Sequence, residues 1–128
     1  MTIIKFTILG EPASKANSRR LVKLKNKPAL IKSKKALDFE QSALLQIPNS
    51  AKQMLTCDIC FKAHIFYASR RPDLDESVIM DILQAKIPNG NVIRRGVYLN
   101  DRQIKEKHIF WGLDKTNPRV EVEITLLL

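Results

Sequence analysis

Hydrophobic and polar residues alternate over several stretches of the chain, the pattern of strands that have one buried face. Residues 2–9 form the first such stretch, which Gly10 and Pro12 end. The longest stretch runs from Cys57 to Ala68. The apolar residues on the predicted buried sides of these two strands are Ile4, Phe6 and Ile8, then Ile59, Phe61, Ala63, Ile65 and Tyr67. We therefore predict one strand near the N-terminus and a long strand in the middle of the chain.

Two further alternating stretches lie near the C-terminus, at residues 103–111 and 119–127. The segment between them, GLDKTNP, contains Gly112 and an Asn-Pro pair, both of which are typical of turns. We expect two closing strands that this turn joins.

Apolar residues recur at helical spacing in two other segments. In the first, Ser33 can cap a helix that runs to about Ile47, where Pro48 closes it. Its predicted core-facing residues are Leu37, Phe39, Ala43, Leu44 and Ile47. The second helix follows the sequence RRPDLDES and ends near Lys86. Its apolar stripe consists of Val78, Ile79, Ile82 and Leu83.

The remaining segments lack a clean period. Residues 11–30 are predicted to be mostly loop, with a short basic hairpin around Asn26 as an alternative, and residues 87–101 are also a loop. With 128 residues, the chain can bury a core as a single domain that spans residues 1–128. The predicted order is strand, helix, strand, helix, strand, strand. This order predicts an α+β fold in which helices pack on one mixed sheet.

Positive charge is concentrated at the start of the chain. The formal net charge is +9, and residues 1–35 contain ten Lys and Arg against one acidic residue. This asymmetry is typical of proteins that bind a polyanion, either nucleic acid or an anionic membrane, and a merely solvated basic face is the alternative. No apolar run approaches the roughly 20 residues of a membrane span, and residues 1–10 do not form a secretory signal. We therefore favour a nucleic-acid partner over a membrane and expect a cytoplasmic protein.

The two cysteines form the sequence CDIC, a spacing found in zinc and redox sites. Zinc would need two more ligands, and neither His64 nor His108 has a ligand spacing to the pair. Since Cys57 and Cys60 are three residues apart in a predicted strand, their side chains would point to opposite faces. We interpret both as reduced residues that contribute to packing.

An acidic cluster precedes the second predicted helix, in the sequence SRRPDLDESVIMDIL. If Asp73 and Asp75 lie on an extended segment, their side chains share one face, with Cα atoms roughly 6 to 7 Å apart. Two carboxylates in this arrangement can hold Mg²⁺, which binds carboxylates together with water and phosphate oxygens. Asp101 directly precedes a predicted strand and would add a third carboxylate at the same edge of the sheet. The alternative is that Asp75 and Glu76 only start the helix.

In combination, these segments resemble the RusA family of Holliday junction resolvases, which occurs widely in bacterial prophages and phages. The resemblance rests on RRPDLDES before a helix and on GVYLNDRQIKEKHIFW after it. FTILGEPASKANSRR is similar to the family's N-terminal strand, turn and basic loop, and IKSKKALDFEQ is similar to its first helix. The similarity follows the family's order along nearly the whole chain, and its specificity lies in the combination of motifs.

The resemblance implies a homodimeric endodeoxyribonuclease of DNA recombination and repair. Such an enzyme uses Mg²⁺, with Mn²⁺ as an alternative, to make paired nicks across four-way DNA junctions. The family's metal-binding aspartates, which are its catalytic residues, correspond to Asp73, Asp75 and Asp101. Five basic residues would position the phosphates of the DNA. These residues are Lys15, Arg19, Arg20, Arg70 and Arg71.

The chain departs from the family pattern at three positions. Glu76 stands where the family has asparagine, and Asn100 replaces the first acid of its D-D pair. Ile79 replaces a lysine that would help to neutralise the transition state. The candidates to take the place of this lysine are Lys86, Arg102 and Lys105.

Other functional classes remain as alternatives. The missing lysine is the best support for a non-catalytic nucleic-acid-binding protein. A phage structural or adaptor protein is a third hypothesis. A nuclease of the P-D…(D/E)-x-K type is disfavoured, because no E-x-K or D-x-K follows RPD on a strand at a suitable distance.

Overall fold

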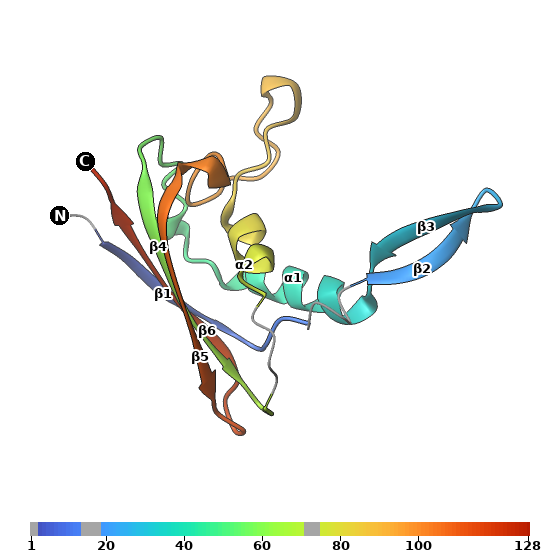
Figure 1. Cartoon of the computed structure of the whole chain (residues 1–128). Helices are drawn as coiled ribbons and strands as arrows, with labels where there is room; N and C mark the ends of the chain where they lie inside the picture. Colours follow the sequence, from blue (N-terminus) through green and yellow to red (C-terminus); the bar gives the residue numbers. More distant parts are fainter. Residues whose placement is uncertain (1–2, 14–18, 71–74) are drawn as a thin grey trace.

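The computed structural model describes residues 3–13, 19–70 and 75–128 of the chain (Figure 1). The strands are β1 (Ile3–Leu9), β2 (Arg19–Leu24), β3 (Lys27–Lys32), β4 (Ile59–Tyr67), β5 (Ile104–Leu113) and β6 (Arg119–Leu126). The helices are α1 (Lys34–Gln46) and α2 (Glu76–Leu83), and the short 3-10 turns are η1 (Asn49–Ala51), η2 (Pro88–Gly90) and η3 (Asp101–Gln103). The expected α+β class is confirmed, since a single small domain contains one mixed sheet and two helices.

The main sheet has four strands in the order β1, β6, β4, β5. β6 pairs antiparallel with both β1 and β4, whereas β5 pairs parallel with β4 at the edge. The two closing strands therefore do not pair with each other, although they follow one another in the chain. A parallel pair needs a crossover, and the crossover from β4 to β5 contains α2 and η3.

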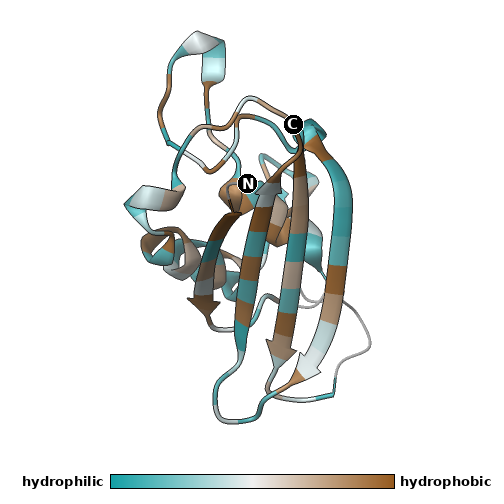
Figure 2. Cartoon of the chain, turned by 90° about the vertical axis from the view of Figure 1, so that its left-hand side faces the viewer, coloured by the Kyte–Doolittle hydropathy of each residue, from teal (hydrophilic) through white to brown (hydrophobic). Residues whose placement is uncertain are grey.

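The helices cover one face of this sheet and leave the other face open (Figure 1 and Figure 2). The alternation predicted for the first and the middle strand is confirmed, because every apolar residue assigned to their buried sides is buried. β6 adds Val120, Val122 and Ile124 to the same core, which Phe39 and Ile79 join from the helices. Because fully burying one such side chain is worth about 1.5–3 kcal/mol, these residues decide which face the helices cover.

Helix α1 begins where predicted, since the Ser33 hydroxyl accepts a 3.2 Å hydrogen bond from the backbone N–H of Ala36. The buried residues of the helix and its C-cap are Ala36, Phe39, Ala43 and Ile47. The prediction that Leu37 faces the core is wrong, because Leu37 is 40% exposed. The buried stripe passes instead through Ala36, about 100° away around the helix.

Strands β2 and β3 form a separate hairpin that extends away from the body of the molecule (Figure 1). The basic hairpin expected around Asn26 is present, but it is longer than expected, and the prediction that this segment is mostly loop is wrong for residues 19–30. Lys25 and Asn26 form its two-residue turn, and both have positive φ angles, 51° and 64°, as a type I′ turn requires. Arg19 pairs with Lys32 and lies on one face of the hairpin, whereas Arg20 lies on the other face.

The chain after α2 forms a projecting loop and then returns to the end of that helix (Figure 1). α2 ends before the predicted limit near Lys86, because the backbone is already extended at Gln84. The backbone N–H of Ala85 then donates a 2.9 Å hydrogen bond to the carbonyl of Tyr98. A Cβ at Gly96 would lie 2.4 Å from the backbone nitrogen of Ala85, so this close approach requires glycine. No helix in the described part of the chain is long and apolar enough to cross a membrane.

The connection between β5 and β6 turns at Asp114 and not at Gly112. The Asp114 side chain accepts hydrogen bonds from the backbone N–H groups of Thr116 and Asn117 at 3.2 and 3.1 Å. Gly112 lies inside β5, where a Cβ would come within 2.6 Å of the Phe66 ring. The prediction of Gly112 as a turn residue is therefore wrong, and its small size serves packing between β4 and β5.

The open face of the sheet carries a mixture of hydrophilic and hydrophobic residues (Figure 2). Glu123 on β6 lies between Lys5 on β1 and Lys62 on β4, with its carboxylate 3.2 Å from each ammonium group. His64 stacks on Phe66 with the ring centroids 4.0 Å apart. Side chains of neighbouring strands therefore interact across this face without a covering helix.

Candidate active site

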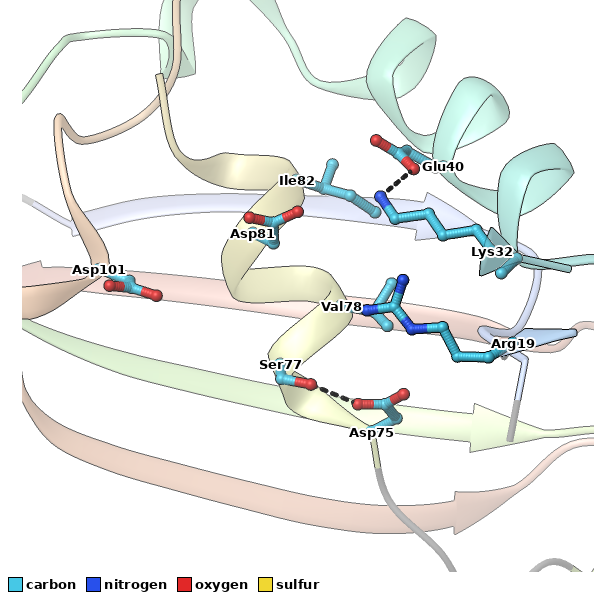
Figure 3. Close-up of a pocket in the computed structure, with 10 residues that line it drawn as sticks. Arg19, Lys32, Glu40, Asp75, Ser77, Val78, Asp81, Ile82 and Asp101 are labelled. Atoms are coloured by element: carbon cyan, nitrogen blue, oxygen red, sulfur yellow. Dashed lines mark hydrogen bonds and ion pairs between the residues drawn. The ribbon is translucent and has the colours of Figure 1, made fainter. Parts of the chain in front are cut away.

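A cleft of about 510 Å³ is lined by residues of α2, of α1 and of the base of the β2–β3 hairpin (Figure 3). The carboxylates that line it belong to Asp75, Asp81, Asp101 and Glu40. The hairpin contributes two basic side chains, those of Arg19 and Lys32. Segments that are far apart in the sequence thus bring acidic and basic groups to one space.

Asp75 occupies the N-cap position of α2, but its side chain does not cap the helix. Its Oδ1 accepts a 2.6 Å hydrogen bond from the hydroxyl of Ser77, and the residue is only 4% exposed. A buried carboxylate is costly unless it is paired, hydrogen-bonded or bound to a metal ion. The hydrogen bond from Ser77 offsets part of this cost, so the position of Asp75 is compatible both with a metal ligand and with a residue that only starts the helix.

Asp81 lies six residues further along α2, about 9 Å from Asp75 along the helix axis. Its side chain is exposed and reaches the cleft. The guanidinium of Arg94 donates to the carbonyl oxygens of Asp81 at 3.3 Å and of Gln84 at 3.1 Å. A cation at the carboxyl end of a helix is stabilising, so Arg94 holds the turn that carries Asp81.

Asp101 begins the 3-10 turn η3 directly before β5, and its exposed side chain lines the cleft (Figure 3). Its backbone N–H donates a 2.7 Å hydrogen bond to Oε1 of Gln84. The side chain of Asn100 caps the turn by accepting from the backbone N–H of Arg102 at 2.9 Å. Asp101 is therefore attached both to the end of α2 and to the start of the edge strand.

Gln103 fixes η3 in place. Its amide nitrogen donates to the carbonyl oxygens of Leu55 and Cys57, both at 2.8 Å. Its Oε1 accepts from the backbone N–H groups of Leu99 at 3.0 Å and Asn100 at 2.8 Å. Because both donor hydrogens and both acceptor sites of the amide are engaged, η3 cannot shift without breaking several hydrogen bonds.

Tyr98 connects the two exposed acids of the cleft. The residue is fully buried, and its hydroxyl donates to the carbonyl oxygen of Met80. Burial raises the pKa of the Tyr98 hydroxyl above its ordinary value, and the negative charges of Asp101 and Asp81 raise it further. The Tyr98 hydroxyl is therefore an un-ionised donor that holds the α2 backbone at Met80.

The two basic residues of the cleft differ in their surroundings. Nζ of Lys32 lies 2.8 Å from a carboxylate oxygen of Glu40, so these two charges largely neutralise each other. The guanidinium of Arg19 extends toward Val78 in the middle of α2 (Figure 3). Arg19 therefore brings positive charge between the acids at the two ends of the cleft.

The structure brings some of the predicted site residues together and leaves others apart. Asp75, Asp101 and Arg19 line the same cleft. Arg20 and Arg70 are exposed and are not among the residues that line it. The predicted site residues that lie outside the described part of the chain are Lys15, Arg71 and Asp73.

The departures from the RusA pattern also have definite positions. The carboxylate of Glu76 lies 3.3 Å from the ammonium of Lys107 on β5 and does not line the cleft. Ile79 is fully buried, so a lysine at this position would point into the core. The three candidates to take the place of the family's lysine do not line the cleft either; they are Lys86, Arg102 and Lys105.

Asp75 and Asp101 do not meet at one edge of the sheet, and that expectation is wrong. Because β4 and β5 are parallel, the end of β4 and the start of β5 lie at opposite ends of the sheet. The two acids line one cleft because α2 lies over the helix-covered face between them (Figure 3).

Sequence reasoning missed Asp81, Gln84 and Arg94. A signal for Asp81 was present in SVIMDIL, where it is the only charged residue and lies four residues after Ser77, on the same helix face. Gln84 and Arg94 had no such signal, because their roles depend on backbone groups that only the fold brings close.

The cleft offers the donors that a hard divalent cation needs. The oxygen atoms of Asp75, Asp81, Asp101 and Ser77 are of the kind that suits Mg²⁺, but the three carboxylates do not all lie within 4.8 Å of one another. A liquid water takes about 30 Å³, so the cleft has room for the waters that Mg²⁺ retains and for a phosphate group. No known protein-family profile matches the chain, and no curated protein has significant sequence similarity to it.

Proposed function

We propose that the protein is a magnesium-dependent endodeoxyribonuclease that resolves four-way DNA junctions, as its resemblance to the RusA family implies. The observation that carries this proposal is that Asp75 and Asp101, from distant parts of the β4–β5 crossover, line one cleft together with Arg19. Carboxylates beside a guanidinium suit a phosphodiester that is bound partly through a divalent ion. The excess of positive charge in residues 1–35 supplies affinity for a polyanion.

Each acid of the cleft has a role in this proposal. Mg²⁺ bound to one of the carboxylates of Asp75, Asp81 and Asp101 would reach the others through its water ligands. When bound, the ion would supply an activated water and neutralise charge on the phosphate during in-line attack. Ser77 orients the Asp75 carboxylate through its 2.6 Å hydrogen bond, and Gln84 holds the backbone of Asp101.

The β2–β3 hairpin is suited to follow the phosphate backbone of DNA. Residues 19–32 contain no acidic residue. The basic residues of this hairpin are Arg19, Arg20, Lys23, Lys25, Lys27 and Lys32. Because the hairpin starts at the cleft and extends outward, a DNA arm whose phosphate lies in the cleft would run along it (Figure 1).

We further propose that the active form is a homodimer. A four-way junction has two-fold symmetry and is resolved by two matched cuts, whereas each chain contributes one copy of this cleft. Analytical ultracentrifugation at micromolar concentration is expected to show the dimer. A monomer that still makes paired cuts would contradict the proposal.

One observation favours a second candidate, a non-catalytic DNA-binding protein. Ile79 stands at the position of the family's lysine and is fully buried, so no positive charge reaches the cleft from there. In that protein the basic hairpin would bind DNA, and the acids would take no part in cleavage. The two candidates differ in what Mg²⁺ does to a bound junction.

The deciding experiment incubates the purified protein with a synthetic four-way junction and with a linear duplex, each in Mg²⁺ or in EDTA. The nuclease is expected to cut the junction only with Mg²⁺, whereas the binding protein retards it without cutting. A structural or adaptor protein would show neither cleavage nor salt-sensitive binding.

Variants assign the cleavage to the cleft. Asp75→Asn and Asp101→Asn should lower the cleavage rate by orders of magnitude, because charged ligands of the ion are lost. Asp38→Asn, at an exposed position of α1 outside the cleft, is the control and should cleave normally. Without metal, Asp75→Asn should bind the junction as well as or better than the wild type, since a negative charge has gone. Cleavage by Asp101→Asn at the wild-type rate would refute the assignment.

A further inference from the structure

Three side chains that can bind a metal ion meet on the open face of the sheet. Cys60 on β4 lies opposite Glu106 on the parallel strand β5, and His108 follows Glu106 by two residues, on the same face. The Sγ of Cys60, a carboxylate oxygen of Glu106 and a ring nitrogen of His108 all lie within 4.8 Å of one another. Cys60 is half-buried, whereas Glu106 and His108 are exposed.

We propose that Cys60, Glu106 and His108 form a zinc site. Thiolate, imidazole and carboxylate are the ligands of protein-bound Zn²⁺, at about 2.3, 2.0–2.1 and 2.0–2.2 Å respectively. In a tetrahedral site with these bond lengths, ligand atoms lie roughly 3.3 to 3.7 Å apart. The ligand atoms of the three side chains are at most 4.8 Å apart, so they need to move only about 1 Å, which small side-chain rotations supply.

The ligand set selects zinc over the cation of the cleft. A thiolate and an imidazole are softer than the oxygen ligands that Mg²⁺ and Ca²⁺ require, so these ions do not compete well here. Three protein ligands leave a fourth position, and the exposure of Glu106 and His108 lets water fill it.

The immediate surroundings are compatible with a bound cation. Lys62 on β4 lies opposite His108 on β5. Its ammonium is 3.2 Å from the carboxylate of Glu123 on β6, the strand that flanks β4 on the side away from β5. This ion pair offsets the positive charge nearest to the site.

A zinc ion at this position would link the edge strand β5 to β4. β5 lies at the edge of the sheet with β4 as its neighbour, and it begins directly after η3, which carries Asp101. The helices lie on the other face (Figure 1 and Figure 2), and residues of both helices line the acidic cleft. The zinc site is therefore separate from the cleft and does not depend on the proposed nuclease activity.

The test uses the full chain, freed of metal with a chelator and kept in excess Mg²⁺ to fill oxygen-ligand sites. Titration with Co²⁺ is expected to give a thiolate-to-cobalt charge-transfer band that saturates at one equivalent and disappears when Zn²⁺ is added. Cys60→Ser should abolish the band, and His108→Ala should weaken Co²⁺ binding at least about tenfold. Cys57→Ser is the matched control and should keep the band, because Cys57 packs against the core.

Thermal unfolding gives an independent readout. Zn²⁺ is expected to raise the Tm of the wild type and of Cys57→Ser but not of Cys60→Ser, because a ligand that binds only the folded state stabilises it. A wild type without the band, a band that survives Cys60→Ser, or one that Cys57→Ser removes would overturn the proposal. Neither readout involves DNA, so failure here and failure of the nuclease assay are distinguishable.

Discussion

The backbone N–H of Asp101 donates a 2.7 Å hydrogen bond to Oε1 of Gln84, the C-cap residue of α2. This bond joins the two parts of the crossover that carry the exposed acids of the cleft. Asp81 precedes Gln84 by three residues, so a single side chain couples the positions of Asp81 and Asp101. We therefore expect Gln84 to position Asp81 and Asp101, and its substitution to lower the affinity of the cleft for Mg²⁺.

We predict that Gln84→Met raises the Mg²⁺ concentration for half-maximal junction cleavage by about tenfold or more, the usual effect of losing a residue that orients a metal ligand. Met keeps the length of the side chain but accepts no comparable hydrogen bond from Asp101. Stability should fall by only about 1 kcal/mol, because a single hydrogen bond is lost. Cleavage assays over a range of Mg²⁺, with urea unfolding alongside, measure both quantities. An unchanged Mg²⁺ requirement would show that the bond does not position Asp101.

Asp81 is predicted to matter as much as the acids expected from the sequence. Asp81→Asn should lower Mg²⁺-dependent cleavage by orders of magnitude, since Asp81 and Asp101 line the same cleft. It should leave the Tm within a few degrees of the wild type, because Asp81 is exposed. Single-turnover cleavage rates provide the measurement. Normal rates in Asp81→Asn combined with loss in Asp75→Asn would place the ion at the other end of the cleft.

The two faces of the hairpin allow a matched comparison of DNA contacts. Arg19→Ala should weaken junction binding and reduce the slope of log affinity against log salt by roughly 0.9, the value for one lost phosphate contact. Arg20→Ala removes the same charge from the opposite face and should change the slope less if DNA passes over the cleft side. Fluorescence anisotropy at several salt concentrations distinguishes them. Equal slopes for the two variants would mean that DNA does not favour one face.

Gln103 is predicted to be a stabilising residue. Its amide makes four hydrogen bonds, each worth roughly 0.5–1.5 kcal/mol, so Gln103→Leu should lower the free energy of unfolding by about 2 to 6 kcal/mol. Gln53→Leu is the control, because the exposed Gln53 amide donates to the carbonyl of Ser50 at 3.2 Å and its loss should cost about 1 kcal/mol or less. Urea unfolding of both variants makes the comparison. Equal losses of unfolding free energy in Gln103→Leu and Gln53→Leu would contradict the stabilising role of Gln103.

Acid sensitivity should involve Glu123. Hydrogen bonds from Lys62 and then Lys5 hold the pKa of this carboxyl below its ordinary value of 4.5. A carboxyl whose pKa is lower in the folded state contributes stability that is present above about pH 4.5 and is lost as the pH falls through the folded value. Glu123→Gln should therefore make stability less dependent on pH below 4.5. Urea unfolding at several pH values tests this, and an unchanged pH dependence would argue against it.

The local pattern of apolar and polar residues correctly predicted the strands and helices that have one buried face. In Ile59–Tyr67, every second residue is apolar and faces the core, and Ser33 marks the start of α1 as a capping residue should. Strand pairing was beyond this reasoning. The insertion of β6 between β1 and β4, and the parallel pairing of β5, depend on contacts between segments that are distant in the chain.

The same limit applies to the sites. The D-x-D spacing pointed to Asp75, and the place before a predicted strand pointed to Asp101. Both line one cleft, but the sequence did not predict the connection between them, which runs through α2 and Gln84. Spacing also gave no reason to associate Cys60 with His108. Their proximity follows from the register of two parallel strands, and no sequence interval encodes that register.

The crossover also divides the cleft between two halves of the chain. Residues 88–93 are exposed and lie between Asp81 and Asp101 in the sequence, so a chain cut there would carry Asp75 and Asp81 on one fragment and Asp101 on the other. The second fragment would have to insert β6 between β1 and β4 of the first. Neither fragment alone would contain the full set of acids. Mixing the two would restore the cleft only through strand insertion, so the protein is suited to fragment complementation, with the proposed DNA cutting as the signal of reassembly.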